Sequence, residues 1–500
     1  MKAEHLSDAI GELDEVMISE AEQVRRKKRK PRWIAWVAAA ACIAIAVALV
    51  RPLILKEDQQ EKVPLGKPDN TILYHSDSTS ADQLIAYANY PKMEQYPNGE
   101  NYLDRWEAYN EAYEAWLSSR HTVRTSAQQP EDVRYFDDFY QASALAFLSS
   151  SVEENLVYSP SNVYMALAML AELTDGQSRQ QILELLGVEN MQELRTQTKY
   201  LWMSNYSDDG MLTTVMANSL WLSEGISYER DTMELLAREY YASSYSGVMG
   251  SEEYNALLRD WLNRQTGDLL QEQVQELSFD PSTVMALAST IYFKGQWSEA
   301  FRTSQTQPDT FYAATGETTV DFMHSSDVGF VYWGESYTAI EKNMENGASM
   351  WLILPDADKS VTDVLSDGEV FQMTSAGVVW EQNKAVTINL AMPKFDVSSN
   401  MDLIEGLQGL GITDVFDSTV SDFTPMTEQL DGIYVSSVDH AARVMVDEEG
   451  CTAAAYTVMM TECAAAICED EINFVLDRPF IFVITGCGDQ PLFIGVVNQV

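Results

Sequence analysis

The stretch Val284–Trp297 reads VMALASTIYFKGQW and says most about the fold. Its first part, Val284–Phe293, contains no charged residue. An uninterrupted apolar run of this kind is typical of a strand that is buried on both of its faces. We therefore expect a strand in the interior of a large sheet at this position.

Other strands and helices surround this run without a regular order. Apolar faces at helical spacing predict helices, and short apolar runs predict strands. The helix near 180–186 is followed by Gly187, a residue that commonly ends helices. The mixture lacks regular strand–helix–strand alternation, which favours an α+β fold with large, mostly antiparallel sheets. The expected helices are 136–147, 163–170, 180–186 and 228–241, and the further strands are 216–222, 349–354, 386–392, 479–485 and 492–497.

The N-terminal part divides into four segments. Residues 1–32 form a tail that ends in a cluster of lysines and arginines, and 33–50 are 18 residues without a charge. That length is sufficient for a membrane-spanning helix, and the preceding basic cluster predicts a cytoplasmic N-terminus with the rest of the chain outside the cell. A cleaved signal peptide, which would make the protein secreted, is the alternative. Residues 51–80 read as a linker, and 81–130 as an aromatic-rich helical extension that packs on the main domain, 131–500.

The composition limits the kinds of partner and site. The formal net charge of -44 argues against nucleic acid, because phosphate binding requires dense lysine and arginine. An acidic surface of this kind attracts basic partners. The five cysteines and five histidines are scattered at spacings that fit no zinc site and no disulfide framework. The sequence therefore predicts neither a metal nor a cofactor.

The segment Gly450–Cys468 reads GCTAAAYTVMMTECAAAIC and lies between two acidic clusters that we expect in water, 447–449 and 469–471. Read with the period of a strand, one face carries the small residues Cys451, Ala453 and Ala455, and the other carries Tyr456 and Glu462. The segment could therefore become a strand that is buried on one side, with Gly450 as a hinge. An ordinary half-buried strand or a mobile alanine-rich loop is the alternative.

Several motifs, in order along the chain, resemble those of the serpin family over 131–500. They are Asn155–Pro160 (NLVYSP) with Ala166–Leu170, Gln180–Gly187, Ala217–Trp221 (ANSLW), Ile291–Trp297 (IYFKGQW), Leu354–Pro355, Pro393–Phe395 (PKF), Gly411–Phe416, Val438–Ala441, Val446–Gly450 and Arg478–Phe480. The resemblance implies a serpin fold with three mostly antiparallel sheets, about eight or nine helices and an exposed reactive-centre loop near 448–470. The basic tail and the span 33–50 suggest a bacterial-type, membrane-anchored member.

The resemblance also implies a mechanism. An inhibitory serpin is not an enzyme; a target endopeptidase attacks its loop and is trapped as a covalent complex while the loop inserts into the main sheet. Insertion of about 15 residues at ~3.3 Å each carries the protease about 50 Å. The implied shutter residues, which control opening of the sheet, are Asn155, Ser159, Pro160, Asn162 and His440. The implied hinge is Glu448, Glu449, Gly450, Cys451, Thr452, Ala453, Ala454 and Ala455.

Five residues depart from the family pattern. Cys451 replaces a threonine or serine, and Tyr456 is large for a hinge but lies on the outward face. Asn162 stands where serine is common, and Ser289-Thr290 where Asn-Ala is common. None of these is a hinge proline or charge, so we expect an active inhibitor that works as a monomer.

The position of the reactive bond is predicted only as a short range of residues, the bracket. Counting forward from Glu448 and counting back from Pro479 give different positions for it. The bracket contains Cys463, Ala464, Ala465, Ala466 and Ile467. Since 450–470 contains no lysine or arginine, an elastase-like or subtilisin-like target fits best, and a papain-like cysteine protease is another option. A disulfide between Cys463 and Cys468 is conceivable, but it would shorten the part of the loop that is offered to the protease. A non-inhibitory serpin-fold binding or structural protein at the cell surface is the alternative function, and a signalling protein that works through its cytoplasmic tail is a third.

Overall fold

The computed structural model describes residues 84–97, 105–132, 134–149, 153–375, 378–451 and 470–500, all within one compact unit that spans 69–500. The expected tail 1–32, membrane span 33–50 and linker 51–80 lie outside these residues, as does the loop segment 452–469. In the part that the structure describes, no helix is long and apolar enough to cross a bilayer.

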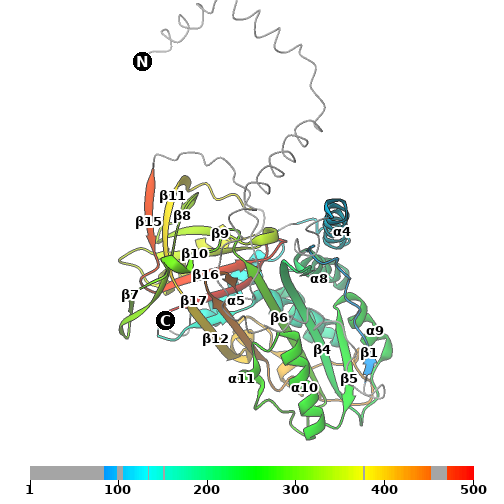
Figure 1. Cartoon of the computed structure of the whole chain (residues 1–500). Coiled ribbons are helices and arrows are strands. Elements are labelled where there is room, and N and C mark those ends of the chain that lie inside the picture. Colours follow the sequence, from blue (N-terminus) through cyan, green and yellow to red (C-terminus); the bar gives the residue numbers. More distant parts are fainter. Residues whose placement is uncertain (1–83, 98–104, 133, 150–152, 376–377, 452–469) are drawn as a thin grey trace, which may run out of the picture. The chain divides into compact units, whose positions relative to one another are not determined.

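The first sheet runs in the order β1-β5-β4-β6-β14-β13-β12, with β3 paired to β4. Its ladders are antiparallel except for the parallel pair β4–β5. Figure 1 shows β4, β5 and β6 side by side. The strands are β1 (Leu84–Ala86), β3 (Ser207–Asp208), β4 (Leu212–Ser223), β5 (Ala242–Gly247), β6 (Met285–Gln296), β12 (Phe395–Asp402), β13 (Asp439–Val446) and β14 (Gly450–Cys451).

The second sheet runs in the order β15-β11-β8-β9-β10-β16-β17-β2, with β7 paired to β8. Only β11 and β15 are parallel in it. Its strands are β2 (Leu156–Tyr158), β7 (Gln307–Ala313), β8 (Gly316–Trp333), β9 (Tyr337–Asn343), β10 (Ser349–Pro355), β11 (Asn383–Pro393), β15 (Glu471–Val475), β16 (Phe480–Thr485) and β17 (Pro491–Val497).

The α+β class and the mostly antiparallel sheets are confirmed, but the described strands form two hydrogen-bonded sheets where three are predicted. The reason is the length of β8. Its first part pairs with β7 and β11, and its last three residues also pair with β9. One continuous strand therefore joins what would otherwise be two smaller sheets, β15-β11-β8-β7 and β9-β10-β16-β17-β2.

The described residues form eleven α-helices rather than the predicted eight or nine, because several are short turns such as α11 and α13. The predicted helices all form, and Gly187 follows α7 in the left-handed conformation at φ +69°, as its position after a helix predicts. The helices are α4 (Trp106–Arg124), α5 (Asp137–Leu148), α6 (Pro160–Leu173), α7 (Gly176–Leu185), α8 (Met191–Asn205), α9 (Arg230–Glu239), α10 (Glu252–Gln265), α11 (Gln271–Val274), α12 (Val361–Asp367), α13 (Glu369–Met373) and α14 (Ile404–Gly409).

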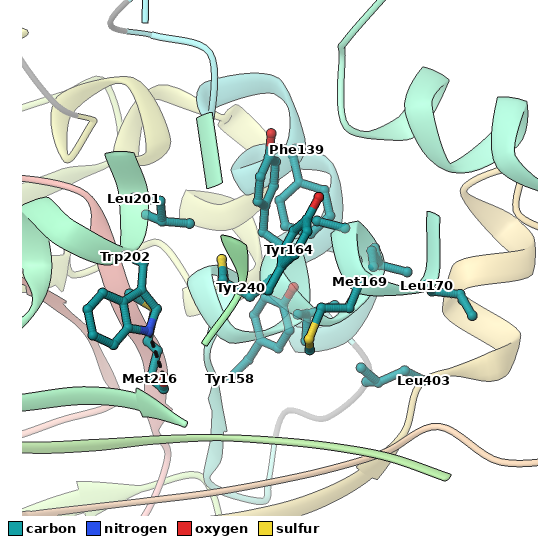
Figure 2. Packing of buried hydrophobic residues seen from close by; sticks show 14 of the residues in the cluster. Phe139, Tyr158, Tyr164, Met169, Leu170, Leu201, Trp202, Met216, Tyr240 and Leu403 are labelled. Atoms are coloured by element: carbon teal, nitrogen blue, oxygen red, sulfur yellow. Dashed lines mark hydrogen bonds between the residues drawn. The ribbon is translucent and has the colours of Figure 1, made fainter. Parts of the chain in front are cut away.

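The main core lies between these helices and the sheets (Figure 2). Helix α6 is buried over nearly its whole length, and Tyr164 on it packs edge-on against Phe139 of α5 with ring centroids 5.3 Å apart. Trp202 of α8 donates its indole N–H to the carbonyl oxygen of Met216 on β4 at 2.8 Å. The bond satisfies the polar atom of a fully buried tryptophan and fixes α8 on the sheet.

Strand β6 corrects the interpretation of Val284–Phe293. A strand forms there, but most of its residues are half-buried, although β6 lies in the middle of the first sheet. Its neighbour β4, by contrast, is almost entirely buried. Within the described residues, β6 pairs with β4 from Met285 to Gly295 on one side and, through Gly295 and Gln296, with β14 on the other.

Helix α4, within the aromatic-rich segment, packs on the rest of the unit. In α4, Trp116 is buried, and the guanidinium of Arg120 lies over its ring, 4.5 Å from the centroid. Arg120 Nε lies 3.1 Å from a carboxylate oxygen of Asp209, whose side chain is fully buried. Ahead of α4, β1 pairs with β5 and adds a strand to the outer edge of the first sheet.

Candidate functional site

The strand β14 is where the predicted hinge enters the first sheet. Gly450 pairs with Gln296 and Cys451 with Gly295 of β6, while Cys451 also pairs with Val446 of β13. Cys451 is only 2% exposed, on the side that the sequence assigns to the inner face. Burial raises the pKa of its thiol well above the usual value, so the side chain stays neutral in the sheet. The remaining hinge residues, Thr452–Ala455, lie outside the described residues.

Trp297, the last residue of the opening stretch, holds the turn before the hinge. Its backbone N–H donates to the carbonyl of Glu449 at 3.0 Å, and its indole N–H donates to the carbonyl of Asp447 at 2.9 Å. The carboxylate of Asp447 in turn accepts from the N–H groups of Glu449 and Gly450. These bonds give the chain one fixed path from β13 into β14.

Glu448 is buried, contrary to the expectation that the cluster 447–449 lies in water. Its carboxylate accepts hydrogen bonds of 2.8 Å from the ammonium of Lys394 and the hydroxyl of Thr306. Burial alone would raise the pKa of Glu448, but these two donors outweigh it and hold the pKa below the usual range. A charge can be buried here because both donors satisfy it, so Glu448 fixes the base of the hinge.

A second buried polar cluster lies where α6 meets the sheets. The hydroxyl of Ser159 donates to the carbonyl of Leu492 at 2.6 Å and accepts from the N–H of Asn162, which caps α6. The N–H of Ser159 donates to Nε2 of His440 on β13 at 3.1 Å. Pro160 occupies the first position of α6, where its missing N–H costs nothing. The cluster links α6 to both β13 and β17.

The two departures from the shutter pattern prove to be partners. The side-chain amide of Asn162 donates to the carbonyl of Ser289 on β6 at 3.1 Å, and the hydroxyl of Ser289 donates back to the amide oxygen of Asn162. That hydroxyl also faces the amide oxygen of Asn218 on β4 at 2.7 Å. Serine and asparagine have therefore exchanged places across one contact, and the side-chain amide of Asn162 has partners for both its nitrogen and its oxygen.

A family model described as "Serpin (serine protease inhibitor)" matches residues 138–500. The chain belongs to the serpin family. Serpin-ZX of Arabidopsis thaliana is 28% identical over 362 residues, which cover 69% of this chain and 92% of the plant protein. The family generally acts by inhibition and not by catalysis.

Solved serpins share the fold. The native state of the thermophilic serpin tengpin has a TM-score of 0.66 and 24% identity, covering 75% of this chain and 96% of tengpin. Thyroxine-binding globulin in complex with thyroxine has a TM-score of 0.61 and 22% identity, covering 73% of this chain and 98% of the globulin. The matched relatives include plant and avian proteins and give no support to the bacterial, membrane-anchored type that the sequence suggests.

The predicted site residues of this serpin do not all come together. Ser159, Pro160, Asn162 and His440 lie in one cluster, but Asn155 does not reach it. The side-chain amide of Asn155 donates to the carbonyl of Gln499, and its oxygen accepts from the N–H groups of Asn498 and Gln499. Asn155 therefore fastens the C-terminal end of the chain to the start of β2. The bracket Cys463–Ile467 lies outside the described residues.

The distal end of the loop is tied to β11. The N–H of Thr387 donates to the carbonyl of Asp470 at 2.9 Å, and Lys384 pairs with the carboxylate of Asp470 at 2.7 Å. From Glu471 onward the chain runs parallel to β11 as β15. The undescribed segment 452–469 is thus fixed at both ends, in β14 of the first sheet and at β15 of the second.

Sequence reasoning missed three residues of the hinge. Lys394 and Trp297 both stood within quoted motifs, PKF and IYFKGQW, but neither was assigned a role. Thr306 lies in the connection before β7 and belongs to no quoted motif. The motifs themselves were a usable signal for the first two, since a lone lysine between the apolar residues proline and phenylalanine needs a partner for its charge.

The buried His440 predicts a pH dependence of folding. Burial lowers its pKa from 6.5 to about 4, and the neutral ring is the form that accepts from Ser159. Between these values the unfolded chain binds a proton that the folded chain does not, so stability is lost as pH falls from about 7 to about 4, by about 3 kcal/mol. Urea unfolding of the wild type and of His440→Gln measures this difference.

Glutamine can still accept the Ser159 hydrogen bond but does not titrate, so His440→Gln should flatten this part of the pH profile. The matched control is His324→Gln, which makes the same substitution at a histidine outside the Ser159 cluster. Equal slopes for wild type and His440→Gln would show that His440 does not contribute.

Proposed function

We propose that this serpin is an extracellular suicide inhibitor of serine endopeptidases, with the loop 448–470 as its bait. The observation that carries the proposal is that β14, at the start of the loop, lies between β6 and β13 and pairs with both. The chain that continues from Cys451 would lengthen this strand if it extended between them. A small pocket at this place is lined by Ile291, Phe293, Arg443, Val444 and Cys451, among others.

The composition of the loop supports the insertion and the choice of target. The hinge residues Cys451–Ala455 are small and uncharged, so they can enter the sheet at low cost. The absence of lysine and arginine from 450–470 favours an elastase-like or subtilisin-like endopeptidase, with the reactive bond within Cys463–Ile467. A papain-like cysteine protease is the second class. The complex is covalent, with one inhibitor molecule per protease.

We further propose that 33–50 anchors the protein in the cell membrane with the serpin domain outside, on the strength of the basic cluster ahead of an uncharged run. Cleavage of that segment would make the protein secreted. N-terminal sequencing of the protein recovered from cells distinguishes the two, since an intact N-terminus in the membrane fraction supports the anchor.

The test of inhibition mixes the purified protein with pancreatic elastase and with subtilisin. A complex that survives boiling in SDS, together with a released C-terminal peptide that begins within 464–468, is the expected result. Cleavage of the loop without a complex, and without a gain in thermal stability, would favour the alternative of a non-inhibitory serpin-fold protein. Mass spectrometry of the released peptide locates the reactive bond.

A further inference from the structure

An apolar surface lies beside the distal end of the loop, on strands β8 and β11. Val328 and Phe330 of β8 are 47% and 52% exposed. They point to the same face because they are two residues apart, and their partners on β11, Thr387 and Ala385, add small side chains to that face. We define this surface, Val328, Phe330, Ala385 and Thr387, as the β8 face.

The β8 face continues an aromatic row that begins in the core. Trp351 of β10 packs edge-on against Tyr332 of β8 with centroids 5.0 Å apart, and Tyr332 contacts Phe330 at 6.3 Å. Trp351 and Tyr332 pack partly on the main core, whereas Phe330 is half exposed. The row therefore gives Phe330 a firm support on one side and leaves its other side to solvent.

The strand register places the β8 face level with the end of the loop. Thr387 pairs with Glu471 on one side and with Val328 on the other, so Val328 lies two strand spacings, or about 10 Å, from the first residue of β15. Strand β11 begins four residues earlier, at Asn383, and so extends about 13 Å beyond the start of β15. Figure 1 shows β8, β11 and β15 together. Phe330 and Ala385 lie in this extension, alongside the exit of the loop.

The surroundings of the β8 face are polar and acidic. Ser326 lies two residues before Val328 on β8, and its side chain is hydrogen-bonded to that of Asn389 on β11. Asn389 also bonds to Glu471 and Asn473 of β15. Exposed Glu335 and Glu381 lie just beyond the strand ends, and the nearest lysine, Lys384, is paired with Asp470. An apolar centre with an acidic margin fits a partner that has an apolar contact surrounded by basic side chains.

We propose that the β8 face is a second contact surface for the target endopeptidase, which is a basic protein. This inference rests on the proposed function. The bracket 463–467 is three to seven residues from Asp470, a reach of at most about 25 Å. A protease domain of about 240 residues has a radius of gyration of about 18 Å. A protease seated on the bond therefore overlaps the region beside Asp470, and the β8 face lies within its reach.

The surface adds affinity and selectivity that a bait of alanines cannot supply. The bracket offers only small side chains to the protease pocket, and small apolar groups discriminate weakly between related sites. An aromatic side chain held at an interface contributes more, and acidic groups around it raise the rate of encounter with a basic protein. Among elastase-like enzymes, the basic ones should therefore be trapped fastest.

The test uses the full-length protein and neutrophil elastase, a basic protease, in which the catalytic serine is replaced by alanine so that it binds but cannot acylate. We expect Phe330→Ser to weaken binding about tenfold. The matched control is Tyr312→Ser on β7, which removes an equally exposed aromatic, at 51%, from the strand that pairs with the opposite end of β8. It should leave binding within about twofold.

The outcomes separate this inference from the proposed function. Equal binding by Phe330→Ser and wild type, equal losses in both variants, or no binding by the wild type would overturn the β8 face as a protease surface. A wild-type dimer that dissociates in Phe330→Ser during sedimentation would assign the surface to a second copy of the chain and overturn it as well. If active elastase forms no covalent complex, yet the inactive enzyme binds in a manner that depends on Phe330, the surface stands and inhibition fails.

Discussion

If insertion proceeds as proposed, replacing Gly450 with alanine should convert this serpin from an inhibitor into a plain substrate, with at least about a tenfold loss of covalent complex. A β-carbon on residue 450 would lie 2.1 Å from the carbonyl oxygen of Gly295 and 2.9 Å from Cα of Gln296. Both atoms belong to the backbone of β6, which cannot give way as a flexible side chain would. The hinge would be expelled from the sheet at its first residue, and the loop could not start to insert before the acyl-enzyme is hydrolysed.

The ratio of covalent complex to cleaved inhibitor, read from SDS gels with pancreatic elastase, measures this effect. Gly409→Ala is the matched control, because no atom lies within 4 Å of the added carbon at that position in α14. The control should give the wild-type ratio. A wild-type ratio for Gly450→Ala would mean that insertion does not pass through β14 as the structure shows it.

The strands and helices were largely predictable, because they depend on local patterns. The apolar run Val284–Phe293 does form a strand, and the helix before Gly187 ends where its glycine predicts. The predictions that failed concern features that depend on neighbouring elements of the fold. The burial of β6 on both faces was a wrong prediction, since the exposure of a strand depends on the elements that cover it, and the sequence of β6 does not reveal them. The joining of two predicted sheets into one could not be predicted either. It results from the length of β8, which pairs with β11 and then also with β9.

The prediction of the site residues was limited in the same way, because their contacts come from other elements of the fold. The small residues of the predicted hinge are visible in the sequence itself, and Cys451, the first residue of the predicted inner face, is buried. Glu448 was expected in water because three acidic residues in a row repel one another, and only the arrival of Lys394 and Thr306 from other elements makes its burial possible. The exchange of Asn162 and Ser289 appeared as two separate departures, although the pair is one compensated contact.

Replacing Asp209 with alanine should be the most destabilising single change outside the loop, with a cost of about 3–5 kcal/mol. The fully buried carboxylate faces Arg120 of α4, and it accepts from the N–H groups of Met211 and Leu212 at 3.0 Å and from the side chain of Asn346 at 3.2 Å. Burial already lowers the pKa of Arg120, whose side chain is only 12% exposed. Removing its counter-charge leaves a cation in a site built for a pair, so α4 should detach from the domain.

Thermal unfolding and protease protection of α4 measure this loss, and the midpoint should fall on the order of 10 °C. Asp209→Asn keeps acceptors for the two backbone N–H groups but removes the charge, so its smaller loss isolates the contribution of the ion pair. Glu234→Ala, which breaks an exposed pair with Arg230, should cost no more than about 0.5 kcal/mol. If Asp209→Ala costs no more than this control, the extension is held by its aromatic contacts and by the β1–β5 pairing, and the buried ion pair contributes only orientation.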